Sequence, residues 1–201
     1  MQIVLASRNP HKLIEVRQLL PPQIEVIPVS ELAPNLDIPE TGQTFEENAY
    51  SKARLVADFT GRLSLADDSG LQVDALNGEP GIYSARYAGP GAKDEDNNRR
   101  LLERMSGIPP ERRTAQFVCV MALVEPGGKA YFTEGVLRGV IALEPHGQHG
   151  FGYDPLFIVP EYGQTFAQLG PEIKNRISHR AQAMDKLLSV IPEVVIGNPG
   201  S

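Results

Sequence analysis

The stretch that most constrains the fold is Leu65–Leu71, in which a largely apolar run ends in Asp67, Asp68, a serine and a glycine. This pattern is typical of a buried strand that brings acidic groups to the rim of a sheet, where ligands of open α/β sheets collect. Neighbouring side chains on a strand point to opposite faces. We therefore expect Asp67 and Asp68 to have different roles, one in a site and one bracing it. The alternative is an acidic turn, because Asp, Ser and Gly are common turn residues.

The composition is that of a globular protein with an excess of acidic groups. The chain has 201 residues, of which 41% are hydrophobic and 22% charged. That is enough for one large domain, or one domain with two lobes, around a packed core. The net charge of -6 disfavours a general nucleic-acid binder, because phosphate backbones require a basic surface.

The single cysteine, Cys119, lies in the apolar run Phe117–Met121 and is predicted to be a buried thiol rather than a nucleophile. One cysteine forms no internal disulfide, which suits a reducing compartment. The first six residues have no basic region and are too short for a signal peptide. The longest apolar run, Phe117–Val124, is well short of the roughly 20 residues of a membrane span. We therefore expect a soluble, cytoplasmic protein without a membrane partner.

A short strand over residues 3–6 leads into a predicted helix whose start carries polar and basic groups. Asn9 is a good N-cap and Pro10 a good first helical residue. Capping explains these two residues without any ligand, but it does not explain Ser7 and Lys12. Together with unpaired backbone N–H groups at the helix start, they favour an anion site. The spacing of a Walker A loop is absent.

A second predicted helix begins with a capping box at Thr44–Glu47 and stops at Gly61. Asn48 and Lys52 are four residues apart, so they share one side of this helix. If that side faces a ligand, Lys52 belongs to a site. Otherwise it is an ordinary solvated lysine.

The second half of the chain is rich in strands. Residues 114–124 and 130–140 predict a long hairpin. A glycine-rich loop over 147–155 then leads into a strand over 156–159. The small residues around Phe151 would let a flat ligand approach the ring. The alternative is a tight turn that carries a core aromatic.

Two further helices are predicted on either side of these strands. Asp94 is expected to cap a helix that runs to Met105 and turns a charged, solvated face outward. Ser178 is expected to open the last helix. Arg180 near that helix start is unfavourable for the helix dipole unless an anion or polar ligand lies there.

Eight motifs of the chain, in the same order and over nearly its whole length, resemble those of the inosine triphosphate pyrophosphatase family. Any one of them is weak, but together they are highly specific. They are Ser7-x-Asn9-x-x-Lys12, Glu40-Thr41-Gly42, Phe45-x-Glu47-Asn48-Ala49, Lys52-Ala53, Ala66-Asp67-Asp68-Ser69-Gly70-Leu71, Pro80-Gly81-Ile82-Tyr83-Ser84-Ala85-Arg86-Tyr87, Phe151-Gly152-Tyr153-Asp154-Pro155 and Ser178-His179-Arg180.

The resemblance implies a mixed α/β fold: a long twisted central sheet with flanking helices, and two lobes around a nucleotide-binding cleft. Residues 1–201 would form a single domain of this kind, without a separate linker. The implied activity is Mg²⁺-dependent hydrolysis of ITP, dITP and XTP to the nucleoside monophosphate and pyrophosphate, which cleanses the nucleotide pool. The implied partners are the nucleotide and a second copy of the chain, with no nucleic acid and no membrane.

The same resemblance implies roles for individual residues. Asp68 would be the catalytic proton acceptor, and Glu40 and Asp68 would hold Mg²⁺. The alternative is that Asp68 orients a water on the metal without taking its proton, because a carboxylate bound to Mg²⁺ is a poor base. The triphosphate would lie on the loop over 7–12, and the base would stack on Phe151. The implied substrate-binding residues are Ser7, Arg8, Asn9, Pro10, His11, Lys12, Lys52, Ser69, Phe151, Gly152, Tyr153, Asp154, Lys174, His179 and Arg180.

Base selection would rest on hydrogen-bond donors. Hypoxanthine and xanthine present a keto oxygen where adenine presents an amino group, so a donor such as Arg180 or a backbone N–H would favour them. Two other classes stay open. One is a nucleotide-binding module without turnover. The other is a phosphatase with an aspartyl nucleophile, although the D-x-D spacing of that class is missing at Asp67–Gly70.

Overall fold

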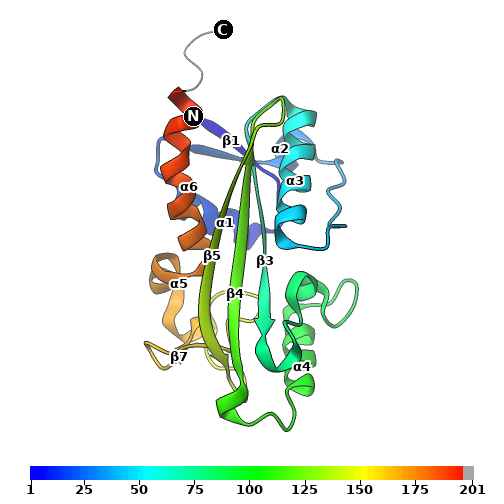
Figure 1. Ribbon diagram of the computed structural model, residues 1–201, viewed down its shortest axis with the longest axis vertical. Coiled ribbons are helices and arrows are strands. Elements are labelled where there is room, and N and C mark those ends of the chain that lie inside the picture. The colour runs from blue at the N-terminus through cyan, green and yellow to red at the C-terminus, as the bar shows by residue number, and fades with distance from the viewer. Residues whose placement is uncertain (197–201) are drawn as a thin grey trace. The chain divides into compact units, whose positions relative to one another are not determined.

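The computed structural model describes residues 1–196, and within this range the strands form one mixed seven-stranded sheet in the order β2-β1-β3-β4-β5-β6-β7 (Figure 1). The mixed sheet with flanking helices confirms the predicted α/β fold. The strands are β1 (Gln2–Leu5), β2 (Glu25–Pro28), β3 (Ser64–Val73), β4 (Thr114–Val124), β5 (Ala130–Ile141), β6 (Phe157–Val159) and β7 (Gln164–Thr165). The helices are α1 (Pro10–Leu19), α2 (Val29–Leu32), α3 (Phe45–Thr60), α4 (Asp94–Arg104), α5 (Phe166–Ile177) and α6 (His179–Ile196), with 3-10 turns η1 (Asp74–Leu76), η2 (Gly81–Arg86) and η3 (Pro110–Arg112).

Strand β3 carries both aspartates and runs well beyond them. It pairs in parallel with β1 at Ser64 and Leu65 only, because β1 ends at Leu5. On its other edge it neighbours β4, and this pairing continues the strand to Val73. Asp67 and Asp68 therefore lie within a strand, at the point where the parallel neighbour stops. The acidic-turn alternative is wrong, and so is the expectation that the strand itself ends at the carboxylates.

Local sequence signals set the helix boundaries. Thr44 is the N-cap of α3, its hydroxyl accepting from the Glu47 N–H at 3.1 Å, and Gly61 ends the helix with a left-handed φ of 64°. The Glu47 carboxylate accepts from the Gln43 N–H at 2.7 Å, one residue earlier than a reciprocal capping box requires. Among the described residues, no helix has both the length and the apolar character needed to cross a membrane.

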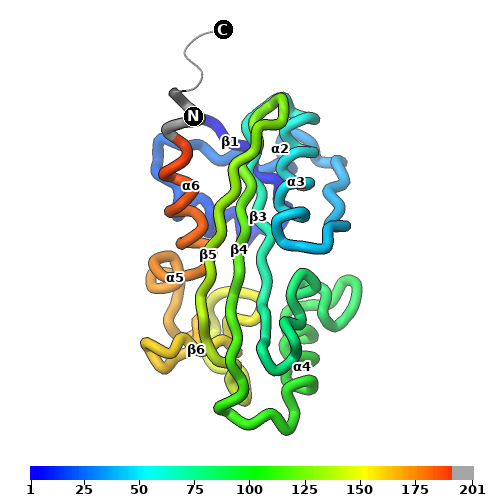
Figure 2. Tube along the Cα trace, viewed as in Figure 1, coloured from blue at the N-terminus to red at the C-terminus, as the bar shows by residue number. Residues whose placement is uncertain are grey.

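The chain divides into two compact units, each assembled from segments that are distant in sequence. Unit 1 comprises residues 1–68, 119–135 and the described part of the segment that begins at Arg180. Unit 2 comprises residues 69–118 and 136–179. The hairpin of β4 and β5, green in Figure 2, contributes strand segments to both units.

Unit 1 has its own apolar core. Side chains of β1, β3 and β4 pack there against one face of α6, with Leu5, Leu65, Met121 and Met184 all buried. Cys119 belongs to the same cluster and is 0% exposed. Burial raises the pKa of Cys119 to about 12, so the thiol stays protonated and unreactive at neutral pH. The prediction of a buried core thiol is confirmed.

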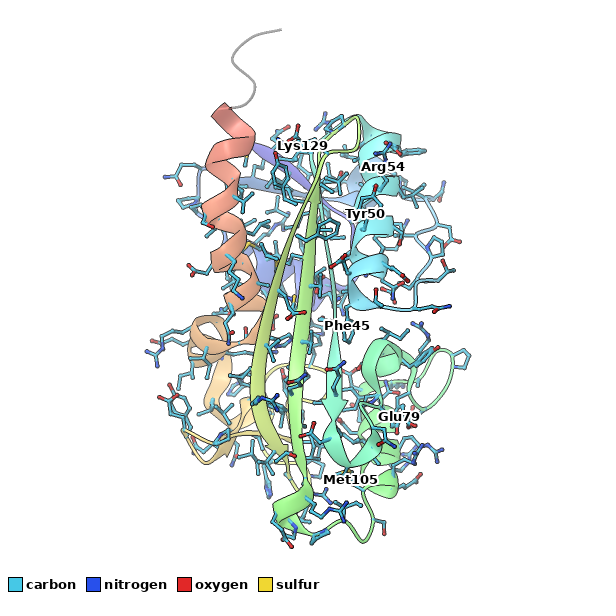
Figure 3. The ribbon with its side chains drawn as sticks, viewed as in Figure 1. Phe45, Tyr50, Arg54, Glu79, Met105 and Lys129 are labelled. Carbon is cyan, nitrogen blue, oxygen red and sulfur yellow. The ribbon has the colours of Figure 1, made fainter. Side chains whose placement is uncertain are left out.

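Unit 2 has a separate core that is rich in aromatic rings. The Phe117 ring centroid lies 4.4 Å from that of Phe157. A buried arginine, Arg113, is 3% exposed and donates to the carbonyl oxygens of Ile141 and Ala142, each at 2.8 Å. It also donates to the carbonyl of Met105 at 3.1 Å, at the end of α4 (Figure 3). Arg113 thus joins the end of β5 to the end of α4 through charge-assisted hydrogen bonds.

We predict that Arg113→Met lowers the free energy of unfolding by about 3 kcal/mol or more, because several buried carbonyl groups lose their donor. Urea denaturation followed by circular dichroism measures the change. Arg112→Met is the matched control, since Arg112 is its exposed neighbour. Equal unfolding midpoints for the two variants would contradict a structural role for Arg113.

Candidate active site

Asp67 is the centre of a buried ion network in unit 1. Its Oδ2 lies 3.0 Å from the Lys12 ammonium and 2.8 Å from a guanidinium nitrogen of Arg180. Arg180 also pairs with the Glu15 carboxylate on α1. Asp67 and Arg180 are each 1% exposed. The anion that the helix dipole requires near Arg180 is supplied by the chain itself.

These charges stabilise one another's ionised forms. Burial alone would raise the pKa of Asp67, but Lys12, Arg180 and Lys52 together hold the pKa well below its usual range. Burial would likewise lower the pKa of Arg180, and Asp67 and Glu15 raise it above its ordinary value instead. Asp67 is therefore a permanent anion that braces two cations, and it is unsuited to accept a proton during a reaction.

Asp68 has different partners and a different electrostatic environment. Its Oδ2 accepts from the Asn48 side-chain amide at 3.0 Å, and its Oδ1 lies 3.5 Å from the Lys52 ammonium. Burial raises the pKa of Asp68 above its ordinary value, and Lys52 opposes that shift without cancelling it. The two aspartates thus have different partners, and their division into a site residue and a bracing residue stays a prediction. Asp68 is the carboxylate whose protonation state is the more easily changed.

The Lys52 ammonium is surrounded by acidic groups. It lies 2.6 Å from Glu40 Oε1 and donates to the Asp67 carbonyl oxygen at 2.8 Å. Burial would lower the pKa of Lys52, but the carboxylates of Asp68, Asp67 and Glu40 raise it. The side of α3 that carries Asn48 and Lys52 thus faces the carboxylates, which excludes the solvated-lysine alternative.

Asn48 is a site residue that sequence reasoning did not assign. It is 0% exposed and links two parts of the site, because its Oδ1 accepts from the Gly42 N–H at 2.8 Å while its amide donates to Asp68. A Cβ on Gly42 would lie 2.8 Å from that Oδ1, so the loop that follows Glu40 requires glycine there. The i, i+4 spacing of Asn48 and Lys52 was the signal that could have identified Asn48.

Glu40 and Asp68 form an acidic pair whose oxygen atoms suit Mg²⁺. Glu40 and Asp68 both approach the Lys52 ammonium, and the Glu40 side chain is 30% exposed. Among the described residues, no group of three or more His, Cys, Asp or Glu side chains is arranged to hold a metal. Mg²⁺ commonly binds through one or two carboxylates and completes its shell with water and substrate phosphates. Glu40 and Asp68 fit that mode, whereas a closed site of four protein ligands does not fit.

The loop before α1 is held mainly by its own hydrogen bonds. Asn9 Oδ1 accepts from the N–H groups of His11 and Lys12 at 2.9 and 3.3 Å, so the expectation of unpaired N–H groups is wrong for those two residues. Arg8 donates to the Leu36 carbonyl at 2.7 Å. Arg8 is thus used in holding the loop, and the Lys12 ammonium in the first turn of α1 is the basic group that this region presents to the carboxylates.

The predicted base-binding residues other than Arg180 lie in unit 2. Asp154 Oδ2 accepts from the Phe151 N–H at 3.0 Å and from the Lys174 ammonium at 2.5 Å. That ammonium lies 4.5 Å from the centroid of the Phe151 ring and is part of a side chain that is only 5% exposed. His179, at the start of α6, stacks on Phe117 with ring centroids 4.8 Å apart.

Glycines in this loop are required by the turn itself. A Cβ on Gly150 would lie 2.0 Å from Asp154 Oδ2, and one on Gly147 would lie 2.3 Å from the backbone of Ala167. Both glycines also have positive φ angles, of 80° and 85°. The tight-turn alternative therefore accounts for these two residues, and close approach by a flat ligand is not needed to explain them.

The structure brings the predicted site residues into two sets. In unit 1 the set is Glu40, Lys12, Lys52, Asp67, Asp68 and Arg180, with Ser7, Arg8 and Asn9 in the loop before α1 and Pro10 and His11 in its first turn. In unit 2 the set is Phe151, Gly152, Tyr153, Asp154, Lys174 and His179, with half-buried Ser69 next to Asp68 on β3. Arg180 forms ion pairs with the Glu15 and Asp67 carboxylates, whereas its neighbour in the chain, His179, stacks on an aromatic ring. Its predicted contact with a base stays a prediction.

Carboxylates with lysines around them, in an α/β fold, are typical of sites that handle phosphate groups together with a divalent cation. The comparisons with known proteins agree with this class. The family model of the Ham1 family matches residues 3–190. The chain belongs to the Ham1 family.

Relatives of known name share most of the chain's length. A dITP/XTP pyrophosphatase of Desulforamulus reducens is 49% identical over 197 residues, covering 98% of each chain. One of Bacillus subtilis is 44% identical over 191 residues, covering 94% of this chain and 96% of the relative. The solved Staphylococcus aureus Ham1 protein superposes with a TM-score of 0.87 at 44% identity, covering 96% of this chain and 99% of that one. A HAM1 protein from Coxiella burnetii gives the same TM-score at 47% identity and the same coverage.

We predict opposite effects on stability for two variants of adjacent residues. Asp67→Asn leaves Arg180 and Lys12 without their shared anion and should lower the free energy of unfolding by about 3–5 kcal/mol. Asp68→Asn should leave it unchanged or raise it at pH 7, because folding raises the pKa of Asp68 and so disfavours its ionised form.

The gain of Asp68→Asn should vanish below about pH 4, where this carboxyl is protonated in both the folded and unfolded states. The stability that ionised Asp67 contributes should largely remain at pH 3.5, because it is lost only as the pH falls from about 4 toward the lowered pKa of folded Asp67. Chemical denaturation at pH 7 and at pH 3.5 measures the unfolding free energies of wild type and both variants. Similar losses for the two variants at pH 7 would show that the two carboxylates are not distinguished by the fold.

Proposed function

We propose that the protein hydrolyses non-standard purine nucleoside triphosphates, namely ITP, dITP and XTP, to the monophosphate and pyrophosphate. The observation that carries this proposal is that the Glu40 and Asp68 carboxylates both lie near the Lys52 ammonium. A second ammonium, that of Lys12, pairs with the adjacent residue Asp67. The names of the dITP/XTP pyrophosphatases that share up to 49% of their residues with this chain support the substrate class. A mere nucleotide-binding module would have little need for two carboxylates at its phosphate site.

In the proposed reaction, water attacks the α-phosphorus and the α–β phosphoanhydride bond breaks. Asp68 accepts a hydrogen bond from the attacking water and takes its proton as the new P–O bond forms, and pyrophosphate leaves. The raised pKa of Asp68 favours this role over Asp67, whose lowered pKa makes it a poor base. Asn48 fixes the orientation of Asp68 by donating to its other oxygen.

Glu40 and Asp68 are the residues that would hold Mg²⁺. The ion, when bound, supplies positive charge to the phosphate oxygens. Lys52 already neutralises part of the charge of these two carboxylates. Mg²⁺ dependence is accordingly part of the proposal, and it is supported by the oxygen donors present in unit 1.

Lys12 and Lys52 are proposed to neutralise the triphosphate. Phosphoryl transfer depends mainly on positioning and on stabilising charge, with little covalent work for the protein. Both ammonium groups are held by carboxylates in this structure, so they are preorganised at low exposure before any phosphate arrives. Preorganised charges of this kind act strongly because they need no rearrangement during the reaction.

The base is proposed to bind in unit 2, stacked on Phe151. The Lys174 ammonium covers one face of this ring, so stacking uses the opposite face. Lys174 and His179 are the side-chain donors of this unit that suit the keto oxygens of hypoxanthine and xanthine. A site built on buried donors discriminates against the amino group of adenine, because donor would face donor.

The proposed cellular role is removal of deaminated purine nucleotides from the nucleotide pool. Since that pool is cytoplasmic, we propose a cytoplasmic location. The net charge of -6 supports a small-molecule substrate over nucleic acid.

We predict that the purified protein with Mg²⁺ releases pyrophosphate from ITP, dITP and XTP, and little from ATP or GTP. Pyrophosphate and orthophosphate are assayed separately for all five nucleotides, with and without EDTA. Asp68→Asn should abolish release while the folded protein remains, which circular dichroism checks. Asp58→Asn, at an exposed aspartate of α3, is the matched control and should retain most of the activity.

Each other outcome has a definite meaning. Orthophosphate in place of pyrophosphate would overturn the cleavage position and favour a phosphatase. Binding of ITP without turnover would make the protein a nucleotide-binding module. Full activity in EDTA would exclude the proposed metal requirement.

We propose a homodimer as the assembly of the chain. An exposed aromatic pair on unit 1 is compatible with burial in such an interface: Tyr50 on α3 and Phe132 on β5 are 36% and 43% exposed, with ring centroids 5.8 Å apart. Tyr50 is labelled in Figure 3, near Arg54 and the turn that carries Lys129. Light scattering after size exclusion should give about twice the chain mass of 21.9 kDa. A mass of one chain at micromolar concentration would contradict the proposal.

A further inference from the structure

Two side chains of α4 hold the backbone of Gly152. Asp94 Oδ2 accepts from the Gly152 N–H at 2.6 Å, and the Asn98 amide donates to the Gly152 carbonyl at 3.0 Å. Asp94 is the first residue of α4 rather than its N-cap, which is Lys93, so the predicted capping role of Asp94 is wrong. Asp94 and Asn98 are four residues apart and therefore lie on one side of the helix, where they reach the two peptide groups that flank the Cα of Gly152.

The residue between these contacts, Asn97, ties α4 to a second segment. Its side chain accepts from the Ala88 N–H at 2.8 Å and donates to the Ala85 carbonyl at 3.2 Å. The two held segments are also joined directly, because the Tyr153 hydroxyl donates to the Ser84 carbonyl at 2.8 Å. Helix α4, the segment over 84–88 and the loop over 151–154 thus form a closed ring of hydrogen bonds within unit 2.

The loop has little packing support on the side that faces α4. A pocket of about 680 Å³ lies there, lined by both elements, including Asp94, Asn98, Leu102, Phe151 and Gly152. A segment that borders open space is positioned by its hydrogen bonds more than by packing. The place of Phe151 and Gly152 on this side therefore depends on Asp94 and Asn98.

The Asn98 side chain lowers the free energy of unfolding relative to an apolar side chain of similar size. The residue is 8% exposed, and its Oδ1 has no hydrogen-bond partner among the described residues. A buried carbonyl oxygen without a donor is unfavourable, and a leucine of similar size would avoid that cost. The hydrogen bond from the Asn98 amide to the Gly152 carbonyl offsets this cost.

We propose that Asp94 and Asn98 are positioning residues for base selection. They fix Gly152, and through it the neighbours Phe151 and Asp154, on which the base site is built. Asp154 in turn holds the Phe151 N–H and the Lys174 ammonium, so a shift of Gly152 displaces both the stacking ring and its donor. The inference rests on the proposed function, since it assigns these residues to the base site of that reaction.

The test compares Asn98→Leu, Asp94→Ala and the conservative Asp94→Asn with wild type. Glu95→Gln is the matched control, because Glu95 is an exposed carboxylate of the same turn that also lines the pocket. The measurements are kcat/KM for ITP and for GTP, the dissociation constant of IMP by calorimetry, and the melting temperature.

We expect Asn98→Leu and Asp94→Ala to weaken IMP binding by about tenfold and to reduce the preference for ITP over GTP by a similar factor. The main change should lie in KM, with kcat lowered less, because Asp68 and Lys52 are untouched. Asp94→Asn keeps an acceptor oxygen and should restore most of the affinity. Asn98→Leu should melt at or above the wild-type temperature, which a merely structural role would not allow.

Unchanged IMP affinity and unchanged base preference in Asn98→Leu and Asp94→Ala would overturn the inference. So would an equal loss of activity on ITP and GTP together with a lower melting temperature, since that is the signature of a structural role alone. If wild type releases no pyrophosphate from ITP, the proposed function fails instead. The calorimetric comparison of IMP binding still decides whether Asp94 and Asn98 position the base site.

Discussion

The buried ion network at Asp67 is the interaction on which unit 1 depends. One carboxylate on β3 serves a lysine at the start of α1 and an arginine at the start of α6, and Glu15 completes the arginine's pairing. Charges this deeply buried are tolerated only when each has a partner. The network therefore fixes two helix starts relative to one strand within this unit. It also places the Lys12 ammonium beside the acidic pair, where the proposed reaction uses it.

Adjacent residues with the same side chain have pKa values shifted in opposite directions because a strand turns them to opposite sides. Asp67 meets cations and becomes a permanent anion, whereas Asp68 meets an amide, a more distant ammonium and a low-dielectric surrounding. Divergent pKa values in neighbouring carboxyl groups are a common sign of divided labour in catalysis. Asn48 adds a link between Asp68 and the loop that follows Glu40, so one side chain orients both proposed metal-binding elements.

In unit 2, hydrogen bonds hold the glycine-rich loop over 147–155 in place. Asp154 holds the loop from inside through Phe151 and Lys174, and α4 holds it from outside through Gly152. The glycines allow the tight course, but the polar side chains determine where the loop lies. Membership of the Ham1 family and the solved relatives agree with this fold.

The sequence by itself determined the local elements and the inventory of chemical groups. The caps at Asn9 and Thr44, the stop at Gly61, the β4–β5 hairpin and the buried thiol of Cys119 all follow from short-range rules, and the structure confirms them. The motifs, taken together, also indicated the family. Only the tertiary structure decided that β3 continues past the aspartates, that Arg180 is engaged by Asp67 and Glu15, and that Asp94 and Asn98 reach Gly152. These features join residues 54 to 165 positions apart in the chain, and no local pattern encodes which distant partner will satisfy a buried charge or a loop peptide.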